Sequence, residues 1–228
     1  MKIQSTAALC GLAAIMALTA CNSLHHETSS SPVELFNGKN LDGWKFVLAD
    51  PNVKPEEVWH VKEGVIICKG TPLGFLYSDL NFTNFRLVVE YRWPPGSKPG
   101  NSGVFSRIHQ PFSAIPSCAE VQLQHGNAGD IMTLQGMKLA ADQPRYFSVK
   151  KHELAGDIGG VKKIQDQEKP PGEWNRIEIL AQGPKYTVWL NGQKGNEAEG
   201  VEVIKGPVGL QSEGGEIEFR RVALTPLE

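Results

Sequence analysis

The sequence predicts an all-β protein, a sandwich of two antiparallel sheets in one domain. Short runs of alternating apolar and polar residues recur along the chain, turn residues separate them, and no long window keeps a helical period. The 228 residues also include 24 glycines and 15 prolines, which suits a chain that turns often. Many short strands at this spacing are typical of a β-sandwich.

The expected strands follow one another from residue 58 to the end of the chain. Lys62-Glu63-Gly64 predicts a hairpin turn, and Asn191-Gly192 is a strong turn signal after another strand. In the last strand the alternation slips near Arg220-Arg221, which predicts a bulge. The strands are expected over 58–61, 65–68, 85–93, 103–109, 119–124, 175–181, 185–190, 208–211 and 216–224. Long loops are expected over 93–101, 126–150 and 156–172.

The charge balance and a motif scan exclude several classes of function. Lys and Arg total 23 against 25 for Asp and Glu, so the net charge of −2 gives no global attraction to nucleic acid. The chain lacks the phosphate-binding GxxxxGK[ST] and GxGxxG patterns, the GxSxG nucleophile motif and the HExxH zinc motif. We therefore expect no nucleic-acid partner, and these catalytic and phosphate-binding motifs give no support for the functions they mark.

The N-terminus has the pattern of an export signal. Lys2 precedes an apolar stretch, Ala7–Ala20, that is too short to span a bilayer comfortably. Small residues before Cys21 resemble the lipobox of bacterial lipoproteins, which implies lipidation of Cys21; the alternative is a plain secretory signal. We expect a signal peptide over 1–20, a flexible tether over 21–32 and a domain over 33–228. The predicted location is the bacterial cell envelope, with the membrane reached through the lipid anchor only.

Two cysteines remain in the predicted domain. Cys68 and Cys118 either form a disulfide, since the predicted compartment is oxidising, or stay as buried thiols. Their spacing does not resemble a metal-binding motif.

Polar side chains gather on the predicted outward faces of three strands. If these strands are neighbours in one sheet, their carboxylate, amide, guanidinium and imidazole groups form a field that suits a hydroxyl-rich ligand. The alternative is the ordinary polar face of a solvated antiparallel sheet. Trp189 has outward parity and could stack on a sugar ring. The polar residues are Glu90, Arg92, Asn101, Arg107, His109, Glu120, Gln122, Gln124 and His125.

The number of acids bears on the reaction. A conventional glycosidase places two carboxylates across the scissile bond, and sandwich glycosidases often carry them at alternate positions of one strand. Here the candidate strand, Glu120-Val121-Gln122, has one acid only. This departure argues against an ordinary two-carboxylate mechanism.

Several motifs together resemble one family. Leu35–Trp44 (LFNGKNLDGW) looks like the opening signature of the bacterial 3-keto-disaccharide hydrolase family, and later segments match it in order across almost the whole predicted domain. One departure is Gln124-His125, where the family often has Asp soon after E-x-Q. The later segments are Glu90-Tyr91-Arg92, Asn101-Ser102-Gly103 with Arg107, Glu120-Val121-Gln122, Pro171–Asn175, Trp189–Gly192, Gly209-Leu210-Gln211 and Glu218-Phe219-Arg220.

The resemblance implies a concanavalin-like jelly roll, usually exported, with a carbohydrate ligand that is an oxidised disaccharide or glycoside. In a sugar oxidised at C3 the ketone acidifies the C2 hydrogen. A base can then remove it, and the C1 glycosidic oxygen leaves by β-elimination. Adding water across the resulting double bond gives net hydrolysis; without that step the enzyme is a lyase.

This chemistry suggests roles for the polar residues. We expect His125 or Glu120 to be the base, Arg107 or a divalent metal ion to stabilise the enolate, and Glu90 to lie in the same pocket. The metal candidates are Glu120 with His125 or His109. The residues expected to bind hydroxyl groups are Gln122, Gln124, Asn101 and Gln211. The alternative function is a non-catalytic, lectin-like carbohydrate-binding module on the same fold.

Overall fold

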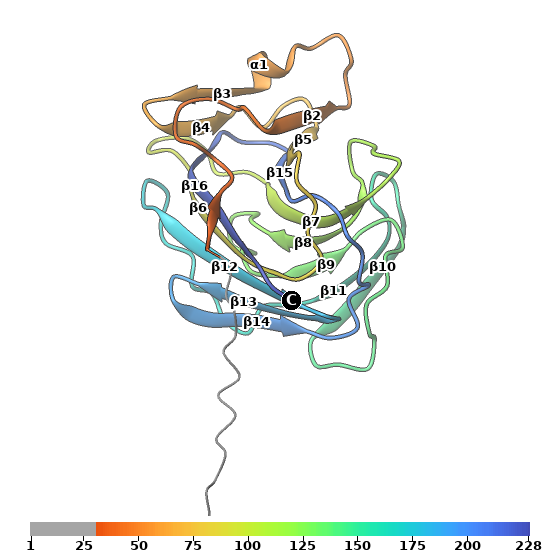
Figure 1. Ribbon diagram of the computed structural model, residues 1–228. Helices are drawn as coiled ribbons and strands as arrows, with labels where there is room; N and C mark the ends of the chain where they lie inside the picture. Colours follow the sequence, from red (N-terminus) through yellow and green to blue (C-terminus); the bar gives the residue numbers. More distant parts are fainter. Residues whose placement is uncertain (1–30) are drawn as a thin grey trace, which may run out of the picture.

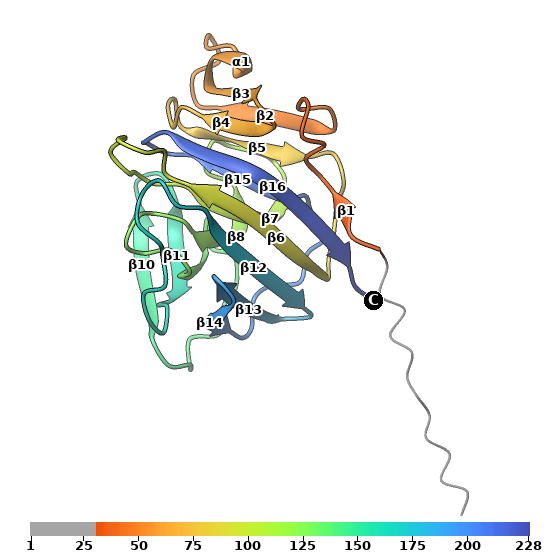
Figure 2. The same cartoon turned by 90° about the vertical axis from the view of Figure 1, so that its left-hand side faces the viewer.

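The computed structural model describes residues 31–228 and contains, within them, sixteen β-strands and one short helix. The strands form two eight-stranded sheets, called sheet A and sheet B below, in which every pairing is antiparallel. Figures 1 and 2 show the two layers from perpendicular directions. The predicted signal over 1–20 and Cys21 lie outside the described residues, as does most of the predicted tether.

Sheet A has the order β14-β13-β12-β6-β16-β4-β3, and β1 also pairs with β16. Its strands are β1 (Val33–Glu34), β3 (Trp59–Lys62), β4 (Val65–Cys68), β6 (Phe85–Arg92), β12 (Asn175–Gln182), β13 (Lys185–Leu190), β14 (Gln193–Ala198) and β16 (Ile217–Pro226). The helix α1 (Pro55–Val58) is a single turn that begins with proline and two acidic residues, both favoured at a helix N-terminus.

Sheet B has the order β10-β11-β9-β8-β7-β15-β5-β2. Its strands are β2 (Trp44–Leu48), β5 (Gly74–Ser78), β7 (Gly103–His109), β8 (Ser117–Gln122), β9 (Ile131–Thr133), β10 (Tyr146–His152), β11 (Gly156–Val161) and β15 (Gly209–Ser212).

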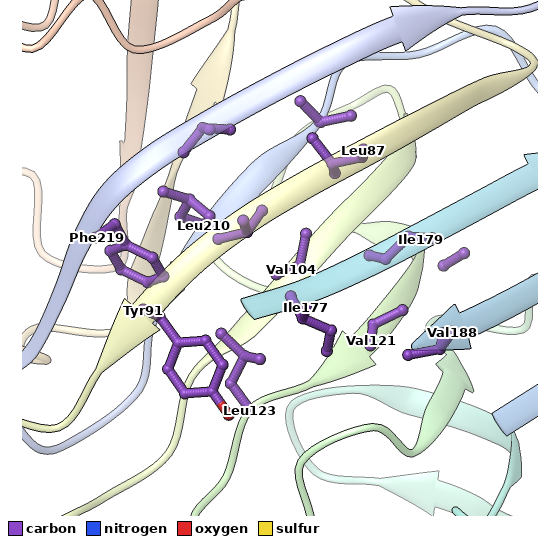
Figure 3. Close-up of a cluster of buried hydrophobic side chains, with 14 of the residues drawn as sticks. Leu87, Tyr91, Val104, Val121, Leu123, Ile177, Ile179, Val188, Leu210 and Phe219 are labelled. Carbon is purple, nitrogen blue, oxygen red and sulfur yellow. The ribbon is translucent and has the colours of Figure 1, made fainter. Parts of the chain in front are cut away.

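The main core lies between the two sheets. Alternate residues of β6 are fully buried there, among them Leu87, Val89 and Tyr91, as the alternation predicts. Sheet B contributes Val104 and Val121, which face the apolar side chains of sheet A across the sandwich (Figure 3). Residues of the same strands with opposite parity therefore face outward, and this parity positions the candidate site.

Local signals for turns and bulges are confirmed. Strands β3 and β4 form a hairpin whose turn residues, Glu63 and Gly64, have positive φ. Strands β13 and β14 are joined at Asn191-Gly192, and both of these residues also have positive φ. The register between β16 and β6 shifts between Phe219 and Arg221, which is the predicted bulge.

Two of the expected long loops contain strands. Strand β9 and the start of β10 lie within 126–150, and β11 lies at the start of 156–172. The β11 sequence hid its strand because it contains Gly156, Gly159 and Gly160, and glycine is depleted in strands. Gly160 nevertheless has a packing role, since the Phe147 ring on β10 occupies the space that a Cβ there would take.

The three polar strands are not neighbours in one sheet. Strands β7 and β8 pair in sheet B, but β6 lies in the middle of sheet A. The outward face of β6 is therefore on the opposite side of the sandwich from the outward faces of β7 and β8. The prediction of one continuous polar field is wrong, because alternation along a strand reports a face but not the sheet to which that face belongs.

A second apolar cluster covers part of the outward face of sheet B. Phe75 and Phe105 are fully buried there, and Phe112 and Ile115 from the β7–β8 connection pack over them. The ring centroids of Phe75 and Phe105 lie 5.7 Å apart in an edge-on arrangement. This outward face consequently has an apolar part beside the polar residues of β8.

Cys68 and Cys118 are both free thiols, buried in different sheets. Burial raises the pKa of the Cys68 thiol to about 12, so it stays protonated near neutral pH. Of the two alternatives drawn from the sequence, the buried thiols are the one observed. In the described part of the chain, no helix is long and apolar enough to cross a membrane.

Candidate active site

Glu120 lies on the outward face of sheet B, in the middle of β8. Its register partner is Phe105 on β7, and its neighbour Val121 faces the core, so the parity predicted for this strand is confirmed. The side chain is 2% exposed, and its Oε1 has no hydrogen-bond partner. Burial raises the pKa of Glu120 well above its ordinary value, and the charge of Glu213 raises it further.

Gly103 makes room for this carboxyl group. A Cβ at Gly103 would overlap Oε1 of Glu120, so the carboxyl lies over the β7 backbone. Glycine is rare inside strands, and here its lack of a side chain leaves the space that the Glu120 carboxyl occupies.

Glu213 is the residue that the sequence reasoning missed. It follows β15 and is half-buried, with Oε2 accepting a 2.7 Å hydrogen bond from Nδ2 of Asn101. Burial raises the pKa of Glu213, and a side-chain hydrogen bond from Gln211 opposes that rise. Glu213 lies two residues after Gln211, so both side chains are expected on the same side of an extended chain. This spacing could have identified Glu213 as a member of the site. Its proximity to Glu120 depends on β15 and β8 both flanking β7.

Three buried acceptor oxygens in this cluster lack a donor. They are Oε1 of Glu120, Oδ1 of Asn101 and Oε1 of Gln211. Leaving a buried polar atom unpaired costs about 1–3 kcal/mol, so such atoms mark places where a ligand donor or a cation completes the bonding. Sugar hydroxyl groups are donors of this kind, and hard cations also prefer carboxylate and amide oxygens. The structure thus brings together three predicted residues, Glu120, Asn101 and Gln211.

Close backbone contacts hold Asn101 and Glu213, the two half-buried members of the cluster, in place. The backbone N–H of Asn101 donates to the Gly214 carbonyl at 2.7 Å. A Cβ at Gly100 would overlap that same carbonyl oxygen, so only glycine permits the approach.

Gln122 and Gln124 stabilise the turn after β8. Oε1 of Gln122 accepts hydrogen bonds from the N–H groups of Leu123 and Gln124, at 2.9 and 2.8 Å. The exposed side chain of Gln124 accepts a 2.7 Å bond from Nδ2 of Asn127. Gln122 shares the face of Glu120, but its carbonyl oxygen is already occupied by the backbone.

His125 pairs with Glu168 rather than with Glu120. Its Nδ1 lies 2.9 Å from Oε2 of Glu168, whose side chain is only 2% exposed. The same carboxylate accepts hydrogen bonds from the Tyr91 hydroxyl at 3.2 Å, the Trp93 indole at 3.1 Å and the Gly126 N–H at 3.0 Å. Glu168 is therefore a buried anchor for the loop that carries His125.

Arg107 is a structural residue, and its predicted role at the enolate is contradicted. The register of β7 shifts after Ser106, where Arg107 has φ of 52°, so its side chain turns inward and lies over the Tyr186 ring. Its guanidinium donates to the carbonyls of Thr83, Gly183 and Glu202 and is fully buried. A bulge reverses the parity of the residues that follow it, which simple alternation does not reveal.

Glu90, Arg92 and Trp189 lie on the outward face of sheet A. The prediction that Glu90 shares a pocket with Glu120 is therefore wrong, and Arg92 and Trp189 lie on the opposite side of the sandwich from Glu120. Glu90 pairs with Arg220 at 2.6 Å, and Arg92 pairs with Glu218 at 2.5 Å. Trp189 lies beside the Arg86 guanidinium, 5.8 Å from the ring centre. These are the paired charges of a solvated sheet face.

The predicted metal ligands do not meet. His109 is exposed at the end of β7, four residues beyond the Glu120 partner Phe105, and His125 faces Glu168. Among residues 31–228, no group of three or more His, Cys, Asp or Glu side chains is placed to hold a metal ion.

A separate hollow of about 180 Å³ lies beside β9, β10 and β11. Its lining includes Lys138, Tyr146 and Lys150, and Lys150 pairs with Asp157 at 3.0 Å. Glu120 and its neighbours are not part of it.

The family model of the 3-keto-alpha-glucoside-1,2-lyase-like domain matches residues 31–225. The chain belongs to this family. This membership supports a glycoside-acting enzyme, a hydrolase or lyase, with a carbohydrate ligand, and it confirms the family suggested by the sequence motifs. No functionally curated protein sequence matches this chain.

Solved structures confirm the predicted jelly-roll sandwich. A proposed glycosyl hydrolase from Parabacteroides distasonis is 22% identical, with a TM-score of 0.61 over 86% of this chain and 94% of its own. The carbohydrate-binding module CBM66 from Bacillus subtilis is 15% identical, with a TM-score of 0.51 over 80% and 95%. LamA from Zobellia galactanivorans, solved with laminaritriose and laminaritetraose, is 10% identical, with a TM-score of 0.55 over 87% and 98%.

Proposed function

We propose that the chain cleaves 3-keto-glycosides by removing the C2 proton and expelling the C1 glycosidic oxygen. The C3 ketone makes the C2 hydrogen acidic, so a carboxyl-based site can perform the proton transfers. Water addition to the resulting double bond would give hydrolysis, and release without it would give a lyase. The site is the cluster around Glu120 on the outward face of sheet B.

One observation carries this proposal within the family: the buried Glu120 carboxyl has an unpaired oxygen beside two further unpaired acceptors, on Asn101 and Gln211. A carboxyl whose pKa is raised by burial can hold or give a proton near neutral pH. The acceptor oxygens match the hydroxyl donors of a neutral sugar. The small net charge of −2 is compatible with an uncharged ligand.

The test is turnover of 3-keto-trehalose and 3-keto-glucosides by the wild type and by Glu120→Gln. We expect the wild type to release free sugar and Glu120→Gln to lose about 10²- to 10⁴-fold in kcat, the usual effect of removing an acid–base group. Glu90→Gln is the matched control, because Glu90 is a strand carboxyl on sheet A. The control should keep its activity.

Ordinary glycosides are assayed in parallel. Cleavage of these substrates without prior oxidation would replace the keto-glycoside proposal with a conventional glycosidase. No turnover of any keto-sugar, with or without added divalent metal, would refute the catalytic claim.

A second candidate function is carbohydrate binding without cleavage. The observation that favours it is that Arg107 and Glu90, expected beside Glu120, are paired elsewhere. Calorimetry with the same keto-sugars and their parent sugars distinguishes the two functions. Saturable binding that survives in Glu120→Gln, with no turnover by the wild type, would establish the binding module.

We further propose that the chain is exported and anchored by a lipid on Cys21. The support is the sequence alone: an apolar stretch that ends in Leu18-Thr19-Ala20-Cys21. Metabolic labelling with a radioactive fatty acid should mark the wild type and not Cys21→Ser. Label on both would contradict the anchor.

A further inference from the structure

Two carboxyl groups from different parts of the chain converge in the candidate site. Glu120 belongs to β8, and Glu213 follows β15, 93 positions later in the sequence. Strand β7 lies between β8 and β15. The Glu120 carboxyl lies over Gly103 of β7, and Asn101, two residues before Gly103, donates a 2.7 Å hydrogen bond to Glu213. The charge of Glu213 accordingly adds to the effect of burial on the pKa of Glu120. The second acid absent from the Glu120 strand is thus supplied by the loop that follows β15.

The surroundings of the two carboxyls differ. Glu120 is buried, its Oε1 has no donor, and it lies close to a second acid, all of which favour the neutral form. Glu213 is only half-buried; burial raises its pKa as well, but side-chain amide hydrogen bonds from Asn101 and Gln211 stabilise the charged form and oppose that rise. Paired carboxyls in unequal environments are typical of an acid and a base in one site.

We propose that Glu213 is the catalytic base that removes the C2 proton and that Glu120 is the acid that protonates the leaving oxygen. This assignment rests on the proposed keto-glycoside activity and gives that site its second catalytic group. Asn101 and Gln211 are positioning residues that hold the Glu213 carboxylate.

The proton transfers balance without another reagent. The Glu213 carboxylate takes the C2 proton, and the C2–H electrons form the enolate with the C3 ketone. When the enolate collapses, the C1–O bond breaks and its electrons leave on the glycosidic oxygen, which takes the Glu120 proton. After this step Glu213 is protonated and Glu120 is ionised. In hydration, ionised Glu120 takes a proton from water as the oxygen adds to C1, and Glu213 returns its proton to C2.

Exchange of the C2 hydrogen in D₂O separates the two roles. Because Glu213 is half-buried and reaches solvent, the proton it removes can be replaced by deuterium. Glu120→Gln should therefore exchange the C2 hydrogen of a 3-keto-glucoside without cleaving the sugar. Glu213→Gln should lose exchange and cleavage together, each by about 10²-fold or more.

Glu213→Gln retains a carbonyl oxygen that can accept the Asn101 hydrogen bond, so a purely structural role would leave exchange largely intact. The matched control is Glu216→Gln, an exposed acid three residues further along the same turn. The control should keep both exchange and cleavage. If Glu213→Gln does not fold, Glu213→Asp is used with the same readouts, and its rates should fall while the pH dependence of the base is retained.

Several results would overturn the assignment. Active wild type with unchanged exchange in Glu213→Gln would remove Glu213 from catalysis and leave the proposed function standing. The reverse pattern, with exchange lost in Glu120→Gln and kept in Glu213→Gln, would make Glu120 the base and refute the proposed division of roles. Absence of both turnover and exchange in the wild type would refute the proposed function and this inference together.

Discussion

The carboxyl group of Glu120 occupies the space in which a side chain at Gly103 would begin. Gly103 is a register neighbour of Gln122, so the two strands bring a glycine and a buried acid into contact diagonally across the sheet. The position of the Glu120 carboxyl therefore depends on the absence of a side chain at Gly103 on the adjacent strand.

Gly103→Ala should impair activity more than folding. The added methyl would displace the Glu120 carboxyl, and overpacking of this kind costs about 1–3 kcal/mol in the free energy of unfolding. We expect a fall in kcat on keto-glycosides of at least about tenfold, comparable to a lost acid–base alignment. The matched control is Gly195→Ala on β14, where the new methyl meets the flexible end of Gln167. Equal loss of activity in both variants would contradict the packing argument.

Glu168→Ala should be strongly destabilising. It would leave the buried Tyr91 hydroxyl and Trp93 indole without their acceptor, which we expect to cost about 2–4 kcal/mol measured by urea denaturation. Asp166→Ala is the control from the same loop. Its exposed pair with Lys163 contributes about 0–1 kcal/mol, so a comparable loss in both variants would argue against a special role of Glu168.

Arg107→Met should unfold the protein more readily without changing the chemistry. The buried guanidinium satisfies the carbonyls of Thr83, Gly183 and Glu202, and leaving them unpaired costs about 3 kcal/mol or more. For the fraction that remains folded below the melting temperature, the pH dependence of kcat should match that of the wild type. A changed profile would return Arg107 to the active site.

Stability should fall as the pH rises through the range in which Glu120 ionises. The folded-state pKa of Glu120 is raised by burial, so the native state binds a proton that the unfolded chain has released. The protonated Glu120 therefore contributes fully to the free energy of unfolding below the ordinary carboxyl pKa of the unfolded chain. This contribution is lost as the pH rises from that value to the raised pKa of the folded state. Glu120→Gln should therefore be more stable than the wild type at neutral and alkaline pH, with a flatter pH dependence. Urea titrations from acid to alkaline pH measure the difference, and parallel curves would contradict it.

Local patterns were sufficient for much of the fold. The alternation of Phe85–Trp93 determined which side chains of β6 are buried, because the side-chain period of a strand is two. The parity of Glu120 and Val121 was equally readable, and so were the turn at Asn191-Gly192 and the bulge before Arg221. Each of these depends on residues within a few positions of one another.

By itself, then, the sequence determined the all-β sandwich, the family and one acid of the candidate site, Glu120. Only the tertiary structure decided which strands share a sheet: it removed Glu90 to the opposite face, turned Arg107 inward at a bulge and placed Glu213 near Glu120. The physical reason is that strand pairing joins segments far apart in the chain, and neither register nor sheet membership is encoded in the alternation of a single strand.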